Sequence, residues 1–280
     1  MASNQHPLHG VARNEKLWPA NKHSLKVCFL NGHDGERKLV RRVVREHYRD
    51  VPMRIKFVFL LEGAPGPSDI RVKFSTESAS FVGRDAEAHP GEATLWLNLH
   101  DNIENYRQRK LQRQADILHE FGHALGMEHE HGHRDCKLTW NYKTLQAITG
   151  WDAKKVHLAY DKIDSARLTT YDPKSIMHYS VSEGETLEGG IKIPLNTKLS
   201  DGDKKLLAAL YPKPPTDPVR TGKRKYDEEL EKDHRKMRKL EEKSNRYYDH
   251  EPYRVTMWQS TMLIGVISLL LVDQVVSLKV

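Results

Sequence analysis

The sequence predicts an α+β fold: one domain with a twisted mixed sheet, a central helix and a last helix, followed by a charged tail. Apolar runs of strand length recur in the N-terminal third of the chain. Apolar residues at helical spacing follow, and the composition turns charged after Pro212. Of the 280 residues, 38% are hydrophobic and 30% are charged, so part of the chain is expected to lie outside a packed core.

Four regions are expected along the chain. Residues 1–15 are polar and are predicted to be disordered, and residues 16–212 are predicted to form the folded domain. Residues 213–254 are rich in charges of both signs, which is typical of a linker or a solvated helix. Residues 255–280 form a hydrophobic tail.

The first half of the domain is expected to consist of strands and one helix. Residues 24–31 predict a strand that the turn signal Asn31-Gly32 closes. The segment 37–49 places its apolar side chains on one face, which predicts a helix packed on a sheet. Further strands are expected at 55–61, 70–74 and 94–99, with a proline-containing loop at 63–67.

One helical segment carries the residues that predict a function. His119 and His123 are one helical turn apart, so both rings can reach the same ion. Glu120 lies beside them, where a general base can take a proton from a metal-activated water. Gly126 can adopt a positive φ angle and turn the chain so that His129 supplies a third nitrogen. Three protein ligands leave a fourth position open, which is typical of catalytic zinc sites.

The helix that carries this motif is expected at 109–125. The short His-Glu-x-x-His pattern alone also occurs on charged helices, where its histidines are merely solvated. The glycine and the third histidine at fixed offsets favour a metal site over that alternative. Two further histidines follow closely, and we expect His131 and His133 to be exposed loop residues or, at most, outer-shell groups.

The extended motif resembles that of the metzincin zinc peptidases, and Glu130-His131 makes it most similar to the astacin branch. A second block, Ser-Ile-Met-His-Tyr at 175–179, is similar to the Met-turn of that family. The resemblance implies a metzincin-like peptidase domain over 16–212, one catalytic Zn²⁺, Met177 as a hydrophobic floor below the histidines, and Tyr179 as a residue that reaches the metal or the transition state. Taken singly, these two would be an ordinary core methionine and an ordinary half-buried tyrosine.

The resemblance also implies how a substrate is held. In metzincins the strand that precedes the zinc helix forms the rim of the cleft and pairs with an extended polypeptide, so Leu95, Trp96 and Leu97 are expected to bind substrate. Edge pairing recognises the peptide backbone and therefore accepts many sequences. An interior strand without a free edge is the alternative. By the same resemblance, Glu130 would anchor a mature amino terminus through a salt bridge.

The second half of the domain is expected to be less regular. Short helices are predicted at 140–148 and 153–160, and the segment 168–171 leads into the Met-turn. Ser200, with the acid Asp203 three residues later, predicts the capped start of a last helix over 204–210.

Charge and cysteine content limit the partners of the chain. The net charge of +7 is spread along the sequence without a basic patch interleaved with aromatic residues, so no nucleic-acid partner is expected. The two cysteines provide no disulfide framework, in contrast to the disulfide-stapled secreted astacins, although a single disulfide remains open. Cys28, in an apolar run, is expected to be buried, whereas Cys136 lies in a polar stretch.

The two ends of the sequence bear on localisation. Met1 to Ala20 lacks the apolar core of a secretory signal, which favours a cytoplasmic protein. Residues 255–272 form a span of 18 residues without a charge. This length is at the short end of what crosses a bilayer core of about 30 Å. Trp258 fits an interfacial anchor, so a tail-anchored membrane protein is one interpretation. Polar residues within the span support the other, an amphipathic or partner-binding tail.

Taken together, these features predict a zinc-dependent endopeptidase that hydrolyses peptide bonds with Glu120 as general base. Two other classes remain. One is a catalytically silent zinc-binding interaction protein, against which the intact Glu120 argues, because no structural role requires a carboxylate at this position. The other is a tail-anchored scaffold built around residues 220–280.

Overall fold

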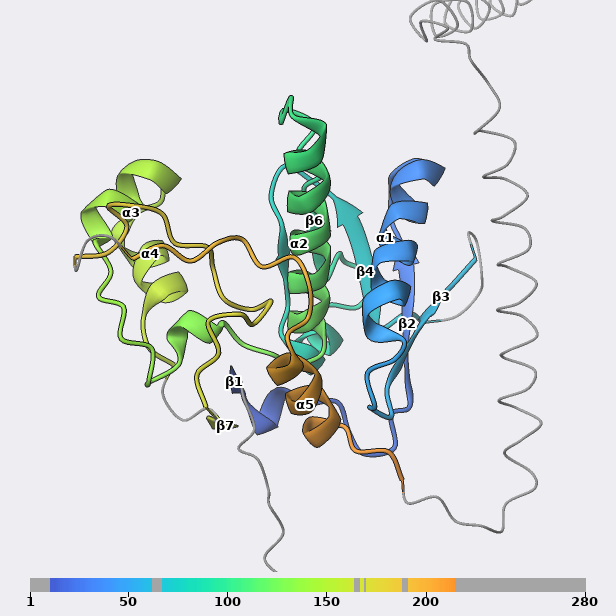
Figure 1. Cartoon of the computed structure of the whole chain (residues 1–280). Coiled ribbons are helices and arrows are strands. Elements are labelled where there is room, and N and C mark those ends of the chain that lie inside the picture. The colour runs from blue at the N-terminus through green and yellow to red at the C-terminus, as the bar shows by residue number, and fades with distance from the viewer. Residues whose placement is uncertain (1–10, 62–66, 164–166, 169, 188–190, 215–280) are drawn as a thin grey trace, which may run out of the picture. The chain divides into compact units, whose positions relative to one another are not determined.

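The computed structural model describes residues 11–61, 67–163, 167–168, 170–187 and 191–214 of the chain (Figure 1). The charged segment expected up to residue 254, apart from its first two residues, and the hydrophobic tail with its possible membrane span lie outside these residues. Within the described ranges, no helix is both long enough and apolar enough to cross a membrane.

A five-stranded sheet organises the first half of the domain, with the strand order β3-β2-β4-β6-β5. Four strands run parallel, and the short fifth runs antiparallel beside β6. The strands expected at 24–31, 55–61, 70–74 and 94–99 are confirmed. Their bounds are β2 (Ser24–Phe29), β3 (Lys56–Phe59), β4 (Ile70–Phe74) and β6 (Leu95–Leu97), and the unexpected strand is β5 (Ala79–Ser80).

The position of β6 corrects the expectation of a free edge at Leu95, Trp96 and Leu97. β6 pairs with β4 on one side and with β5 on the other, so its backbone groups face two neighbours. The side chains of Leu95 and Leu97 are fully buried in the core. In the described part of the chain, the edge of the sheet on this side is β5, not β6.

Two long helices lie against the same face of this sheet (Figure 1). α1 (Asp34–Tyr48) starts in a capping box made by His33 and Glu36. α2 (Tyr106–Ala124) starts three residues before the expected helix, where Asn105 accepts a hydrogen bond from the Gln108 amide. The Tyr48 hydroxyl donates to the Leu118 carbonyl at 2.6 Å, which fixes α1 against α2 in the core.

The second half of the domain contains two short helices, which confirm the prediction for this region. α3 (Tyr142–Thr149) and α4 (Ala153–Tyr160) pack around a small separate core of Trp140, Leu145, Val156 and Val181. Gly150 closes α3 in the left-handed conformation. The last helix, α5 (Asp201–Leu210), starts with a capping box made by Ser200 and Asp203, as predicted.

The N-terminal segment corrects one boundary. β1 (Val11–Ala12) pairs antiparallel with β7 (Arg167–Leu168), and the Val11 carbonyl accepts a hydrogen bond from the Glu128 amide at 2.9 Å. Both residues of β1 are buried. The short helix η1 (Asn14–Lys16) follows. The prediction of disorder is therefore wrong for residues 11–15, because a polar segment with only two apolar residues can still be ordered by pairing with distant strands.

Candidate active site

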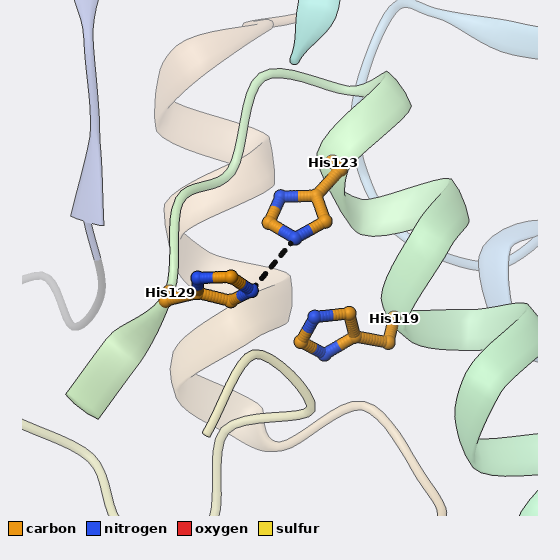
Figure 2. Close-up of side chains that lie close together, drawn as sticks. All are labelled: His119, His123 and His129. Carbon is orange, nitrogen blue, oxygen red and sulfur yellow. Dashed lines mark hydrogen bonds between the residues drawn. The ribbon is translucent and has the colours of Figure 1, made fainter. Parts of the chain in front are cut away.

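Three histidines converge at the C-terminal end of α2 (Figure 2). His119 and His123 project from the helix, and His129 projects from the segment that follows it. The helix ends at Ala124, and Gly126 takes a φ angle of +86°, which reverses the chain. A side chain at this position would be strained, and its Cβ would lie 2.9 Å from a methyl carbon of Leu17. The predicted turn and the predicted convergence are confirmed.

The distances fit one metal ion. The candidate ligand atoms of the three histidines all lie within 4.8 Å of one another. The Nε2 atoms of His123 and His129 are 3.1 Å apart. Two nitrogens bound to a tetrahedral Zn²⁺ at about 2.0 to 2.1 Å are separated by about 3.3 Å, close to the separation found here. Among the described residues, no other group of histidine, cysteine, aspartate or glutamate side chains is gathered in this way.

Backbone carbonyl groups hold two of the rings in the tautomer that a metal needs. His119 Nδ1 lies 2.9 Å from the Ile176 carbonyl, and His123 Nδ1 lies 2.8 Å from the Met127 carbonyl. A carbonyl oxygen only accepts, so each Nδ1 carries the proton and each Nε2 keeps its lone pair. Burial lowers the pKa of His119 and lowers that of His123 to about 3. All three rings, His129 included, are therefore neutral donors at pH 7.

Glu120 is buried on the same helix, with 5% of its surface exposed. Its Oε2 atom has no hydrogen-bond partner among the described residues. Burial, reinforced by the nearby Asp116 charge, raises the pKa of Glu120 well above its usual range. A buried carboxylate oxygen without a partner is costly, and such atoms are expected where a ligand, a metal or a water completes the site.

The Met-turn lies directly below α2. Met177 is fully buried, and a Cβ placed on Gly122 would lie 2.5 Å from its sulfur, so the glycine allows the turn to approach the helix closely. The Met177 carbonyl accepts from the Glu130 amide at 3.0 Å, next to His129. Tyr179 packs its ring 4.5 Å from the His129 ring and 5.8 Å from the His119 ring, measured between centroids. Both predicted Met-turn residues thus lie at the histidine cluster.

Asp203 holds the Met-turn in place, a role that the sequence did not reveal. It was expected only as the acid of a capping box. Its carboxylate accepts from the Ser175 hydroxyl at 2.6 Å and from the Ile176 amide at 2.9 Å, in addition to the Ser200 amide at 2.8 Å. Because the Ile176 carbonyl in turn orients His119, Asp203 supports a metal ligand through one intervening residue.

His131 and His133 are not exposed loop residues; both are fully buried. His131 Nε2 donates to the Ala159 carbonyl at 2.7 Å, and its ring packs 4.3 Å from the Tyr179 ring. His133 Nδ1 accepts from the Asp135 amide. His131 lies in the helical turn η3 (Glu130–Gly132) and His133 directly follows it, and α4 packs against this turn. The polar sequence around the two histidines predicted exposure, because burial here depends on contacts with residues distant in sequence.

Cys136 is buried, Cys28 is only half-buried, and both are free thiols. Glu130 is fully buried, and its Oε1 accepts from the Asp172 amide at 2.7 Å. Its Oε2 has no hydrogen-bond partner among the described residues, and burial raises its pKa to about 8.

Comparisons with known proteins agree with this geometry. The sequence model of the family Astacin (Peptidase family M12A) matches residues 10–194, more than half of the chain. A structure of myroilysin matches with 28% identity and a TM-score of 0.63, covering 73% of this chain and all of that one. A second, a crystal structure of myroilysin, matches with 29% identity and a TM-score of 0.53, covering 71% and 86% of the two chains.

A third structure is high choriolytic enzyme 1, a hatching enzyme zinc-protease from Oryzias latipes (medaka fish), at 18% identity and a TM-score of 0.48, covering 71% of this chain and 95% of that one. A comparison with curated proteins finds no match. The family match confirms the resemblance predicted from the histidine motif and the Met-turn.

Proposed function

Because this chain belongs to the astacin family of zinc metallopeptidases, peptidase family M12A, we propose that it is an endopeptidase that cleaves polypeptides bound in extended form, with Glu120 as general base. The observation that carries the proposal is the convergence of three neutral imidazoles beside a buried carboxylate with an unpartnered oxygen. Structural zinc sites are closed by four protein ligands, whereas three ligands and a neighbouring base are typical of hydrolytic sites.

His119, His123 and His129 are the residues that would hold Zn²⁺, which supplies Lewis-acid polarisation of the scissile carbonyl and a lower pKa for the attacking water. Glu120 takes a proton from this water while the water oxygen attacks the carbonyl carbon. When the carbon–nitrogen bond breaks, Glu120 delivers that proton to the leaving nitrogen. A carboxylate whose pKa is raised by burial is a better base for this transfer than an exposed one.

We assign to Tyr179 the donation of a hydrogen bond to the oxygen that becomes negative during attack, because its ring packs against the ring of His129. Burial raises the pKa of its phenol, so the hydroxyl keeps its proton at neutral pH. Its ring packs against the rings of both His129 and His131, which limits the positions that the hydroxyl can take. A preorganised donor of this kind lowers the cost of charge development.

The antiparallel edge strand β5, rather than β6, is the element that we assign to substrate pairing. It borders the sheet on the side of α2 and contacts that helix. A peptide added to this edge would be held by backbone hydrogen bonds and would accept many sequences. Glu130 remains our candidate anchor for an amino terminus, since one of its buried oxygens has no hydrogen-bond partner among the described residues.

Digestion of casein or gelatin by the purified chain tests the proposal. Wild type is expected to cleave, a chelator to stop cleavage, and Glu120→Gln to remove it while zinc stays bound. The matched control is Glu128→Gln, because the Glu128 carboxylate pairs with Arg13 and Lys16 instead of lying unpartnered. We expect this control to retain activity within about threefold.

The other outcomes distinguish the alternatives. Zinc binding without any cleavage by wild type would indicate the silent interaction protein. A chain ending after Pro212 is expected to cleave like the full chain, and loss of cleavage on truncation would favour a role for the tail. Equal cleavage by wild type and Glu120→Gln would refute Glu120 as the base.

A further inference from the structure

A polar cluster outside the metal site joins three separate segments of the chain. Asp116, on α2, accepts hydrogen bonds from the Ser78 hydroxyl at 2.7 Å and from His100 Nε2 at 2.8 Å. Its other oxygen accepts from the Gln112 side chain at 2.8 Å. Ser78 directly precedes β5, and His100 lies in the loop between β6 and α2. The cluster thus ties the start of the edge strand and this loop to α2.

The cluster is partly buried. The side chains of His100 and Asp116 are 21% and 16% exposed, so solvent competes only weakly with the bond between them. Asp116 lies three and four residues before His119 and Glu120, the spacing at which side chains share one face of a helix. Asp116, which holds the edge strand, therefore lies on the same helix, α2, as a metal ligand and the base.

The loop at His100 is held in an unfavourable backbone conformation. His100 has a φ angle of +51°, and it is the one non-glycine residue with positive φ in the described part of the chain. Such strain persists only where the surroundings enforce it. The Asn98 side chain accepts from the His100 amide at 2.7 Å, and the Asn98 backbone amide donates to the Ser78 hydroxyl at 3.0 Å. Ser78, which binds Asp116, is therefore also bonded to the residue that holds the strained turn.

β5 needs such support. It has two residues, and its pairs are Ala79 with Trp96 and Ser80 with Leu95. A strand this short on the edge of a sheet gains little from its own ladder. The Ser78 hydroxyl, which both donates to Asp116 and accepts from Asn98, anchors its first end to the helix and to the end of β6.

We propose that Asp116, with Ser78 and His100, forms a polar clasp that positions the edge strand β5 for pairing with an extended peptide substrate. Asp116 is a positioning residue in this proposal and takes no part in bond breaking. The proposal rests on the proposed endopeptidase function. Its consequence is selective: loosening the clasp weakens the binding of peptides long enough to pair with β5 and spares peptides that reach only the metal and Glu120.

Kinetics with two peptides test this consequence. Asp116→Asn keeps the size of the side chain but removes its negative charge and leaves a single acceptor oxygen for the three donors. For a peptide of about ten residues we expect KM to rise about tenfold with kcat changed less than about threefold. For a peptide of about four residues KM is expected to stay within about twofold. Ser78→Ala should raise the KM for the long peptide in the same way. Ser78→Thr, which keeps the hydroxyl, should have the KM of wild type.

Asp69→Asn is the matched control. The Asp69 carboxylate also joins distant segments, accepting from Lys22 at 2.5 Å and from the Lys26 amide at 2.8 Å, and its side chain is 19% exposed. It precedes β4 and contacts none of the clasp residues through these bonds. Both peptides should keep their KM in this variant. Equal losses for the two peptides, a loss confined to kcat, or the same effect in Asp69→Asn would overturn the proposal.

Hydrogen exchange of the zinc-loaded protein provides a readout that does not depend on cleavage. We expect the amides of residues 79–82 to exchange at least about tenfold faster in Asp116→Asn than in wild type, with residues 24–29 unchanged. Unchanged exchange at 79–82 would refute the clasp itself. If wild type cleaves neither peptide, the proposed function fails and so does the substrate role of the clasp, whereas its structural part is decided by exchange alone.

Discussion

At the scale of single residues, the site requires each metal-binding histidine ring to keep the lone pair on Nε2 free. His119 and His123 can offer Nε2 to a metal because backbone carbonyls of Ile176 and Met127 bind the protons on Nδ1. These carbonyl partners belong to the Met-turn and to the segment after Gly126. Residues that never touch the metal therefore set the chemistry of those that do.

Tyr179 yields a prediction at this scale. Tyr179→Phe removes the hydroxyl and keeps the ring that packs against His129 and His131. Because the lost hydrogen bond forms only as charge develops, kcat is expected to fall by about 10- to 100-fold with KM little changed. Steady-state kinetics measure both. Tyr160→Phe, on the ring beside Tyr179, is the control, and an equal fall of kcat there would show that the effect is one of packing.

Asp203 yields a prediction for pH. Burial raises the pKa of this carboxyl to about 6, against a usual value near 4, in spite of the bonds it accepts. Between these two pH values the folded chain holds more protons than the unfolded chain. The free energy of unfolding therefore falls as pH rises through this window, by about 3 kcal/mol in total for this group, and stays lower above it.

The difference between wild type and Asp203→Asn isolates this contribution. Denaturant unfolding at pH 4, 5, 6 and 7 with chelator present is expected to show the free energy of unfolding of wild type falling relative to that of the variant up to about pH 6. Asp201→Asn, an exposed change in the same helical turn, is the matched control. A difference that is flat or rises with pH would contradict the assignment.

At the scale of elements, the turn between α2 and His129 depends on Gly126. Gly126→Ala forces a side chain into a φ angle of +86° and against Leu17. We expect a loss of about 1 to 3 kcal/mol in the free energy of unfolding, together with weaker zinc binding because His129 shifts. Denaturant unfolding and zinc titration measure the two effects.

Gly150→Ala is the control for Gly126→Ala. Gly150 has a φ angle of +69° but no atom within 4 Å of the added Cβ, so it isolates the cost of the backbone conformation from that of displacing the site. Zinc affinity should stay at the wild-type value in this control. Unchanged zinc affinity in Gly126→Ala as well would contradict the role of the turn.

The regular elements could be predicted because their signals are local. β4 and α4 begin and end at the predicted residues, since apolar spacing and caps mark both ends. β5 could not be predicted, because Ala79 and Ser80 carry no pattern and become a strand only by pairing with β6. The interior position of β6 was missed for the same reason: strand order depends on contacts distant in sequence.

The site was predictable to a similar depth. The three ligands and Gly126 follow from spacing, because a helix and a tight turn translate sequence offsets directly into positions. The Met-turn follows from the resemblance of residues 175–179 to the family motif. The supporting residues do not. Asp203 binds the Ile176 amide across 27 residues of sequence, and Asp116 binds the Ser78 hydroxyl across 38. Only the fold brings such partners together.

For the whole molecule, the metal is expected to be part of the stability of the domain. α2, the turn after it and the Met-turn meet at the three histidines. A ligand that binds only the folded state adds about 4 kcal/mol at a thousand times its Kd. Removing zinc by dialysis against a chelator is expected to lower Tm by about 5 to 15 °C, and adding zinc should restore it. Calorimetry measures the change, and an unchanged Tm would contradict this linkage.

Zinc stoichiometry of the purified chain tests the central claim most directly. Titration of the metal-free chain with Zn²⁺, checked by elemental analysis, is expected to give one ion per chain for wild type and for His131→Phe, which keeps a buried ring beside the site. His129→Ala, which removes one of the three nitrogens, should bind at least about 100-fold more weakly. No zinc bound by wild type, or equal affinity in wild type and His129→Ala, would contradict the account.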